Sequence, residues 1–439
     1  MADVHLSEVS RRNPDGSWAL SEFTLSIADG EIMVLTGPSG SGKTTTLRVV
    51  AGLEEPTSGT ISVAGEVVNG ISIHARDVAL VTQEHTLYPH LTVEENLRFA
   101  LELRRTPAAE VHRRVDAEAR VLKLGRMLKR LPHTLSAGHR QTAALGRATT
   151  RAPRVFLLDE PLHALDAAER TRVRSELMVF LKGMGVTTLY VTNDQIEAMM
   201  MGDRVAVLAD GGVRQVGPPQ ELLDQPLDRF VAGFFGTPGM RFADALVEEQ
   251  SGLAWYRLAD QRLRIPAALP GPLRAWRDRT VVLGVRPWRL GDARAEPEHP
   301  ADARLHAVVD HFERHGHEDL VLFTVGEDQL CARFPSGSAP PAGSPVEVTV
   351  DTNHLTSSTP PPARPSGTAV PDPSGVTPFP HRPISHREPA EERSPCTTAP
   401  PSPGAARPSV TFRRRRRREG GASGGSERWT VGRCRRSGG

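Results

Sequence analysis

The sequence predicts an α/β fold in which a large domain built on a mostly parallel sheet precedes a small all-β, OB-like domain and a C-terminal tail. Over roughly the first 235 residues, short apolar runs alternate with longer helical patterns, which is typical of strands joined by crossover helices. After Gly236–Gly239 the pattern changes to short strand-like pieces separated by Gly, Pro and Asp. From Thr356 onward Pro, Ser, Arg and Gly dominate, and no hydrophobic core can be built from that composition.

Four short runs in the large domain have the length and β-branched content of strands rather than of buried helices. They are Glu31–Thr36, Val155–Leu158, Val186–Thr192 and Arg204–Ala209. A different stretch, at about residues 93–135, is rich in Leu, Arg, Glu and Ala and carries no strand signal. We expect this stretch to form a helical subdomain inserted between two halves of the sheet.

The chain has 439 residues, which is more than one ordinary hydrophobic core accommodates, so we expect several domains. The changes of pattern predict a large domain over 1–236, a β domain over 237–355 and a disordered tail over 356–439. Within the β domain, Thr280–Arg286 and Pro345–Val350 have the spacing and composition of strands in a small antiparallel barrel.

Composition narrows the setting in which the protein acts. A formal net charge of +2 gives no global field that would attract nucleic acid or an anionic membrane, so we expect no nucleic-acid partner. The three cysteines, Cys331, Cys396 and Cys434, form no closely spaced disulfide framework, which favours a reduced, cytosolic compartment. No signal peptide and no spanning helix are expected, so a role at a membrane would require docking on other subunits.

One glycine-rich segment has the spacing of a phosphate-binding loop, and both of its neighbours fit that interpretation. Gly37–Thr44 follows a predicted strand and precedes the helical pattern Thr45–Ala51. Glycines allow backbone N–H groups to surround phosphates at the positive end of a helix. We expect Lys43 to reach the β- and γ-phosphates and the Thr44 hydroxyl to bind Mg²⁺. The candidate nucleotide-binding residues are Gly37, Pro38, Ser39, Gly40, Ser41, Gly42, Lys43, Thr44 and Thr45.

Two adjacent carboxylates end the predicted strand in Val155–Pro161. A buried strand explains the apolar run but not the two acids that follow it. This arrangement allows Asp159 to hold the shell of a magnesium ion while Glu160 polarises an attacking water. Taken with the phosphate loop, these acids predict nucleotide hydrolysis.

Several further motifs occur in a characteristic order along the chain. They are Arg76–Gln83, Leu87–Asn96, Leu135–Gln141, Leu145–Ala148, Asp159–Pro161, Leu165–Asp166, Val191–Ala198, Asp228–Pro238 and Gly284–Pro287. Together with the phosphate loop, this series resembles ABC transporter ATPases. The last three motifs are similar to those of the carbohydrate-importer branch, which includes maltose and multiple-sugar ATPases. The resemblance covers about residues 4–355.

The resemblance implies a head-to-tail dimer, formed by two copies or with another ABC ATPase, that closes on two ATP molecules. It implies that Gln83 senses Mg²⁺ and the γ-phosphate, and that Ser136 and the Gly138 amide contact the γ-phosphate bound by the partner. It further implies a TOBE-type regulatory barrel and docking of the helical subdomain on two membrane permease subunits. The protein would then act peripherally at the cytoplasmic face of the membrane, served indirectly by an extracellular solute-binding protein.

Four positions depart from the family pattern. Asn193 stands where the family has a histidine near the γ-phosphate, and an amide cannot carry a proton or a positive charge. Ala137 replaces a glycine and is expected to place a methyl group beside the phosphate-facing backbone. His139 replaces a glutamine, and Asn13 stands where an aromatic ring usually stacks on adenine, a position that Trp18 could supply.

These departures lead to the hypothesis that the protein binds Mg-ATP and hydrolyses it slowly. Three alternatives remain open. The changes could be tolerated at full activity, the importer could serve polyamine, iron or sulfate instead of sugar, or the chain could be a weakly hydrolytic regulatory subunit. The sequence does not identify the transported solute, because the solute contacts the permease and the external binding protein.

The composition of the chain changes abruptly after Leu355. In the carbohydrate branch this region commonly continues as His-Leu-Phe-Asp-Pro, and the codons CAC CTC TTC GAC CCN read one base later encode Thr-Ser-Ser-Thr-Pro, as in Thr356–Pro360. We therefore hypothesise that 356–439 is translated out of frame from a GC-rich gene. The alternative is a solvated tail whose Arg413–Arg418 run attracts RNA or anionic lipid.

Overall fold

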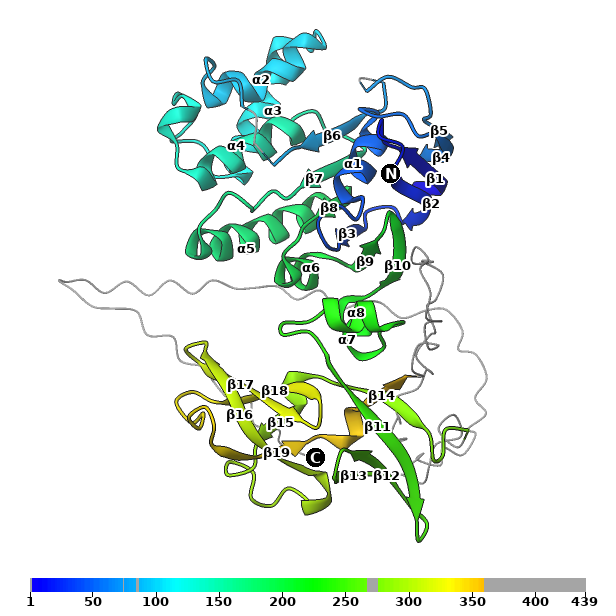
Figure 1. The fold of residues 1–439 in the computed structure, drawn as a ribbon. Coiled ribbons are helices and arrows are strands. Elements are labelled where there is room, and N and C mark those ends of the chain that lie inside the picture. The colour runs from blue at the N-terminus through cyan, green and yellow to red at the C-terminus, as the bar shows by residue number, and fades with distance from the viewer. Residues whose placement is uncertain (1, 74, 84–86, 267–274, 359–439) are drawn as a thin grey trace, which may run out of the picture. The chain divides into compact units, whose positions relative to one another are not determined.

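The computed structural model describes residues 2–73, 75–83, 87–266 and 275–358 (Figure 1). The first part contains, in chain order, β1 (Val4–Arg12), β2 (Trp18–Ile27), β3 (Ile32–Thr36), α1 (Lys43–Ala51), β4 (Ser58–Val63), β5 (Glu66–Val67), β6 (Val78–Val81), α2 (Val93–Leu103), α3 (Ala108–Val121), η1 (Pro132–Thr134), α4 (Ala137–Thr149), β7 (Val155–Asp159), α5 (Ala167–Met184), β8 (Thr187–Val191), α6 (Gln195–Met201), β9 (Arg204–Ala209), β10 (Gly212–Gly217), α7 (Pro219–Asp224) and α8 (Arg229–Phe234).

The large sheet has the strand order β10-β9-β3-β8-β7-β6, and all neighbouring pairs are parallel except the edge pair β9 and β10. Successive residues of a strand enter different cores, because side chains alternate between the two faces. Met33 and Leu35 of β3 belong to one core cluster, whereas Ile32 and Val34 belong to the other. The four predicted strands are confirmed as β3, β7, β8 and β9, each with its ends within one residue of the expected bounds.

A second, antiparallel sheet has the order β2-β1-β4-β5. Buried residues of β1, β2 and β4 share a core cluster with α1 and with one face of the large sheet. Within this sheet, Arg12 of β1 lies opposite Trp18 of β2. The two sheets therefore hold between them the loop that joins β3 to α1.

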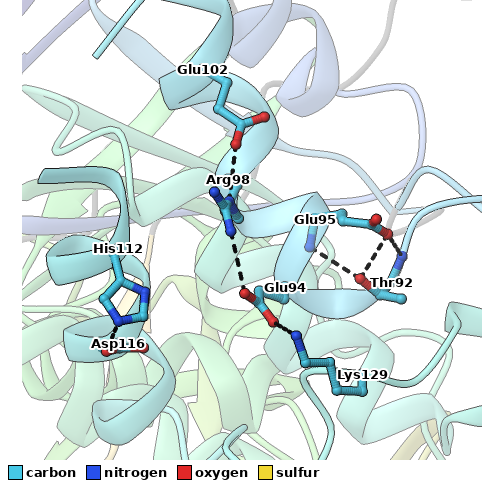
Figure 2. Close-up of polar contacts among 8 residues, drawn as sticks. All are labelled: Thr92, Glu94, Glu95, Arg98, Glu102, His112, Asp116 and Lys129. Carbon is cyan, nitrogen blue, oxygen red and sulfur yellow. Dashed lines mark hydrogen bonds and ion pairs between the residues drawn. The ribbon is translucent and has the colours of Figure 1, made fainter. Parts of the chain in front are cut away.

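The helical insertion contains α2 and α3, which pack with α4 over a core of their own (Figure 1). Figure 2 shows how α2 begins at Thr92, whose side chain accepts a hydrogen bond from the Glu95 amide while the Glu95 carboxylate bonds back to Thr92. Such a capping box satisfies amides that a helix leaves free at its start. Arg98 then bridges Glu94 and Glu102 one turn away on each side. The expected helical subdomain is confirmed as helical.

The described residues after α8 form β-strands and short 3-10 helices. It contains β11 (Arg241–Gln250), β12 (Leu253–Leu258), β13 (Gln261–Ile265), β14 (Thr280–Val285), η2 (Pro287–Arg289), β15 (Leu290–Asp292), η3 (Ala301–Ala303), β16 (Arg304–Arg314), β17 (Glu318–Val325), β18 (Asp328–Pro335), β19 (Pro345–Val350), η4 (Thr352–His354) and β20 (Thr356–Ser358). These strands form two antiparallel five-stranded sheets with the orders β13-β12-β11-β14-β20 and β15-β19-β16-β17-β18. Both sheets contribute to one core cluster, which is the barrel-like packing expected for this region.

One buried arginine fastens the start of this β region to the preceding helices. The Arg286 guanidinium donates hydrogen bonds to the carbonyls of Leu223, Ala232 and Phe235 at 2.6 to 2.8 Å. Burial lowers the pKa of Arg286 to about 10, and the distant Asp224 opposes this shift. The domain boundary expected after residue 236 falls in the connection between α8 and β11, and it stays a prediction.

The last strand corrects the expected start of the tail. The tail was expected from residue 356, but β20 pairs Thr356–Ser358 with β14, because backbone hydrogen bonds extend a sheet edge whatever the side chains. Ser358 is buried, and its hydroxyl has no hydrogen-bond partner among the described residues. The rest of the expected tail, 359–439, lies outside the described residues, and the frame hypothesis stays a prediction.

Candidate nucleotide-binding site

The phosphate loop connects β3 to α1 through backbone conformations that only glycine adopts easily. Gly37, Gly40 and Gly42 have φ angles of 154°, 83° and 98°. A Cβ atom at Gly37 would lie 2.3 Å from the Leu208 carbonyl oxygen, and one at Gly42 would lie 2.7 Å from the Ala19 carbonyl oxygen. The loop therefore requires glycine both for its turn and for its close approach to neighbouring backbone.

Lys43 begins α1, and its ammonium group lies over the loop. The Nζ atom donates hydrogen bonds to the carbonyls of Gly37 and Pro38, each at 2.8 Å. Burial lowers the pKa of Lys43, and the charges of Glu160 and Asp159 oppose that shift. The Nζ atom also donates to the Ser41 hydroxyl at 3.4 Å. An ammonium that is desolvated and bonded to neutral oxygens of its own loop is well placed to gain from an anion.

Thr44 links the phosphate loop to the strand that carries the paired acids. Its hydroxyl donates a hydrogen bond to Asp159 Oδ1 at 3.2 Å. Burial raises the pKa of Asp159, and the Thr44 hydrogen bond opposes this shift. A hydroxyl and a carboxylate in contact at the end of a phosphate loop form a pair of hard oxygen ligands of the kind that Mg²⁺ prefers.

Glu160 lies directly beyond Asp159 in a strained backbone conformation, with a φ angle of 44°. Its amide donates to the Val191 carbonyl of β8 at 2.9 Å, which fixes the turn at the edge of the sheet. Its carboxylate oxygen Oε1 accepts a hydrogen bond from Asn193 Nδ2. A non-glycine residue held at positive φ is a feature that often accompanies function, because the fold must stabilise it.

Asn193 and Gln83 reach the same edge of the sheet as the paired acids. Asn193 lies two residues past Val191, the end of β8, and Gln83 lies two residues past Val81, the end of β6. Because β3, β8, β7 and β6 run parallel, the loops that follow them gather at the carboxyl edge of one sheet. The Gln83 side chain is exposed there.

The signature segment, Leu135–Gln141, lies apart from this edge, at the start of α4. Ser136 caps the helix by accepting a hydrogen bond from the His139 amide, and its hydroxyl lies 2.8 Å from His139 Nδ1. The partly buried methyl group of Ala137 packs against the core cluster on this side of the large sheet, and its expected place beside the phosphate-facing backbone stays a prediction. The alanine therefore completes local packing at the first position of the helix.

Two side chains near the site were not selected from the sequence. Glu169 of α5 accepts a hydrogen bond from the Gly138 amide at 3.2 Å and one from the Ser136 hydroxyl at 3.4 Å. His163 lies with Nδ1 at 3.4 Å from Glu160 Oε2, on the side of the carboxylate opposite Asn193. The sequence could have indicated His163, because a histidine lies only three residues after Glu160, the second of the paired acids.

For Glu169, the sequence predicts a different contact from the one in the structure. The segment Asp166–Glu169 matches a capping box, in which the glutamate would bond back to the first amide of its own helix. Asp166 does accept from the Glu169 amide at 2.8 Å. The Glu169 carboxylate instead turns to α4, because Gly138 leaves room for it: a Cβ atom at Gly138 would lie 2.4 Å from Glu169 Oε1.

Trp18 is the aromatic residue available at the position expected for adenine stacking. The Asn13 amide is used within a turn, where it donates to Ser17 Oγ at 3.0 Å. Trp18 is 51% exposed, and the Arg12 guanidinium lies 5.5 Å from the centre of its ring. The ring thus presents open surface next to the sheet that borders the phosphate loop.

Comparison with known proteins agrees with this geometry. Residues 20–163 match the family model described as ABC transporter. The chain is 44% identical over 340 residues to the trehalose/maltose import ATP-binding protein of Thermococcus litoralis, covering 76% of this chain and 91% of that protein. It is 39% identical to the trehalose import ATP-binding protein of Mycobacterium tuberculosis, covering 81% of this chain and 96% of that protein. It is also 41% identical to the sn-glycerol-3-phosphate import ATP-binding protein of Chromobacterium violaceum, covering 81% and 94%.

The chain therefore belongs to the ATP-binding proteins of ABC transporters, in the branch that contains these relatives. It has the phosphate-loop ATPase fold of that family, with a helical insertion and a following β region. Its chemistry is ATP binding and ATP hydrolysis coupled to transport.

Proposed function

We propose that this chain energises the import of sugars by binding and hydrolysing ATP at the carboxyl edge of its large sheet. The observation that carries the proposal is the hydrogen bond between Thr44 and Asp159, which joins the phosphate loop to the catalytic strand. In this proposal Gly37–Thr45 surrounds the phosphates, and Lys43 exchanges its bonds to loop carbonyls for bonds to phosphate oxygens.

The residues present fit a magnesium ion. Thr44 and Asp159 supply the hydroxyl and the carboxylate, and Gln83, at the same sheet edge, supplies a side-chain oxygen. When bound with ATP, the metal neutralises charge on the phosphates. Asp159 must be ionised to act as a ligand, and Lys43 and Arg48 lower its pKa against the effect of burial.

Glu160 has the position and environment of the residue that polarises the attacking water. Its two carboxylate oxygens face Asn193 on one side and His163 on the other, so the group is held in one orientation. Asn193 orients Glu160 but brings no positive charge to the reaction centre. We infer that hydrolysis is slow compared with a site that has histidine at this position.

The proposed assembly is a head-to-tail dimer, either of two such chains or with another ABC ATPase, docked on two permease subunits. Ser136 and Gly138 would meet the γ-phosphate bound by the opposite subunit. A hollow between β6, α2 and α4 supports permease docking, because it offers an apolar floor with a cationic rim to a segment of another protein. Its lining includes Leu80, Tyr88, Phe99, Leu103, Arg104, Arg147 and Arg151.

The proposed location is the cytoplasmic face of the cell membrane. None of the helices in the described ranges is long and apolar enough to cross a bilayer. Cys331, the cysteine within the described part, is a buried free thiol, as suits a reduced compartment. An extracellular solute-binding protein would deliver the substrate to the permease without contacting this chain.

The substrate class is tested by uptake into cells. Deleting the gene should abolish uptake of radiolabelled trehalose or maltose, and restoring the wild-type chain, but not Lys43→Ala, should recover it. Sugar as the substrate rests on the similarity to the trehalose/maltose import protein of Thermococcus litoralis and the trehalose import protein of Mycobacterium tuberculosis. Unchanged sugar uptake together with lost uptake of polyamine, iron or sulfate would replace sugar with one of those solutes.

The second candidate function is a weakly hydrolytic regulatory subunit. It is favoured by the asparagine at position 193 and by the carboxylate that occupies the signature segment. Phosphate release from the purified chain should rise when the permease is added in membranes if the chain is an importer subunit. A rate that stays equally low with and without the permease would instead support the regulatory role.

A further inference from the structure

The start of α4 already holds an anion supplied by the chain itself. The Glu169 carboxylate accepts hydrogen bonds from the Gly138 amide at 3.2 Å and from the Ser136 hydroxyl at 3.4 Å, both through Oε1. These are the two groups that the proposed function assigns to the γ-phosphate of the opposite subunit. The carboxylate packs closely against the Gly138 backbone, because a Cβ atom at Gly138 would come within 2.4 Å of the same oxygen.

A carboxylate and a phosphate compete for this place in two ways. Both are acceptors, and the single N–H of Gly138 cannot serve an oxygen of each at full strength. Both are also negatively charged, so bringing them to the same helix start is electrostatically unfavourable. The Glu169 side chain is 21% exposed, and solvent screening around it is therefore incomplete.

A second place for the Glu169 carboxylate lies nearby on its own helix. Arg172, one turn along α5, has an Nη2 atom 3.7 Å from Glu169 Oε1 and an Nη1 atom 3.2 Å from Glu176. The guanidinium therefore already pairs with the oxygen that contacts Gly138, and it can stay paired with the carboxylate when the hydrogen bond to Gly138 is broken.

We propose that Glu169 is an autoinhibitory residue that occupies the γ-phosphate position of the signature segment and sets the ATP concentration at which the dimer closes. This inference rests on the proposed function, because it needs the phosphate to approach Ser136 and Gly138 from another subunit. Binding of ATP to the phosphate loop does not involve Glu169. Occupancy of one subunit and closure of two subunits thus become separable steps.

The test follows closure directly in protein that does not consume its ATP. In a Glu160→Gln background, the dimer fraction is measured by sedimentation velocity across a titration of Mg-ATP. Glu169→Gln keeps the size of the side chain and removes its charge, and it should lower the midpoint by about tenfold. Glu169→Leu also removes the acceptor and should lower the midpoint at least as far.

Glu176→Gln is the matched control, because Glu176 lies on the same helix and pairs with the same Arg172 but makes no hydrogen bond to α4 within the described part of the chain. Its midpoint should equal that of the parent. Dimers that form with the same midpoint in parent, Glu169→Gln and Glu169→Leu would overturn the role of Glu169 alone. Chains that bind ATP but never dimerise would overturn the composite site of the proposed function and this inference with it.

Discussion

The phosphate loop and the signature segment are both assigned to ATP phosphates in the proposed function, but they differ in the groups that occupy them. In the loop, the Lys43 ammonium is desolvated and bonded to neutral carbonyl and hydroxyl oxygens, so an incoming anion gains a strong partner. In the signature segment, the donors of Ser136 and Gly138 are already bonded to the Glu169 carboxylate. An anion must displace another anion there.

This difference separates two steps that a composite site could have joined. Binding within one subunit is prepared, because the loop conformation and the contact between Thr44 and Asp159 exist in the single chain. Closure against a second subunit has to remove Glu169 first. The catalytic carboxylate Glu160 then meets an amide at Asn193 and not an imidazole. The chain is therefore better equipped to hold ATP than to close on it and cleave it.

The largest expected effect comes from removing the lysine that distinguishes the loop. Lys43→Ala should weaken ATP binding by about 100-fold or more, because it removes a desolvated, charge-assisted partner of the phosphates. The fold should persist, since burial of the ammonium is itself unfavourable. Equilibrium binding of a fluorescent ATP analogue measures the loss, and Lys182→Ala, at an exposed lysine of α5, is the control. Binding retained by Lys43→Ala would place the nucleotide elsewhere.

Glu160→Gln should divide binding from chemistry. Loss of the general base is expected to slow phosphate release by about 100-fold or more while ATP affinity stays within a factor of about two. The glutamine can still bond to the Asn193 side chain, so the local fold should be kept. Single-turnover phosphate release and nucleotide binding, measured on the same preparation, test both halves. A variant that hydrolyses at the wild-type rate would exclude Glu160 as the base.

Asn193→His tests whether the altered edge of the site limits turnover. An imidazole at this position can donate a hydrogen bond and carry a positive charge, so phosphate release should rise by about tenfold. Asn193→Ala, which removes the contact with Glu160 without adding charge, is the comparison variant and should not be faster than wild type. If Asn193→His leaves the rate unchanged, the hypothesis of impaired hydrolysis is wrong.

The smallest effect concerns the far end of the signature helix. Burial raises the pKa of Glu118 on α3, and the hydrogen bond that it accepts from Thr149 at the end of α4 opposes this shift. A carboxyl group with a raised folded-state pKa destabilises the fold when it ionises, so the penalty is absent below the unfolded value near 4.5 and grows as pH rises through the folded value.

Glu118→Gln removes that penalty and should therefore raise the thermal midpoint relative to wild type by about 1 to 2 °C at pH 7.5. Near pH 4 the two proteins should unfold at the same temperature, apart from losses common to both. Scanning fluorimetry across pH 4 to 8 checks the difference. Glu118 contacts Thr149 at the end of α4, whereas Ser136 lies at the start of that helix. Its replacement should therefore leave ATP-driven dimerisation unchanged.

Much of the fold followed from the sequence because its signals are local. Strands such as β3 and β8 are rich in apolar and β-branched residues and are buried along their whole length, and the spacing of Gly37–Thr44 has few other uses. The helical insertion was recognisable because its residues favour helices and lack β-branched runs. The start of the tail was misplaced, because pairing of β20 with β14 depends on backbone groups that every residue carries.

The site was predictable where one motif supplies the whole geometry and less predictable where two distant segments meet. The contact between Thr44 and Asp159 follows from two motifs at the ends of parallel strands. The contact between Glu169 and Gly138 could not be predicted in this way, because it joins the starts of two helices that are distant in sequence. The sequence Asp166–Glu169 instead predicts a capping box within α5. The packing of the Ala137 methyl group against the core could not be predicted from the sequence either, since it depends on residues that are distant along the chain.

The most direct test of the account is one titration of Mg-ATP against the Glu160→Gln chain, with bound nucleotide and dimer fraction recorded on the same samples. The account predicts two separate transitions, in which ATP occupancy reaches its midpoint at a concentration about tenfold lower than the dimer does. It also predicts that Glu169→Gln moves only the second transition. Occupancy and dimer formation that rise together in both proteins would contradict the claim that binding is prepared and closure is held back.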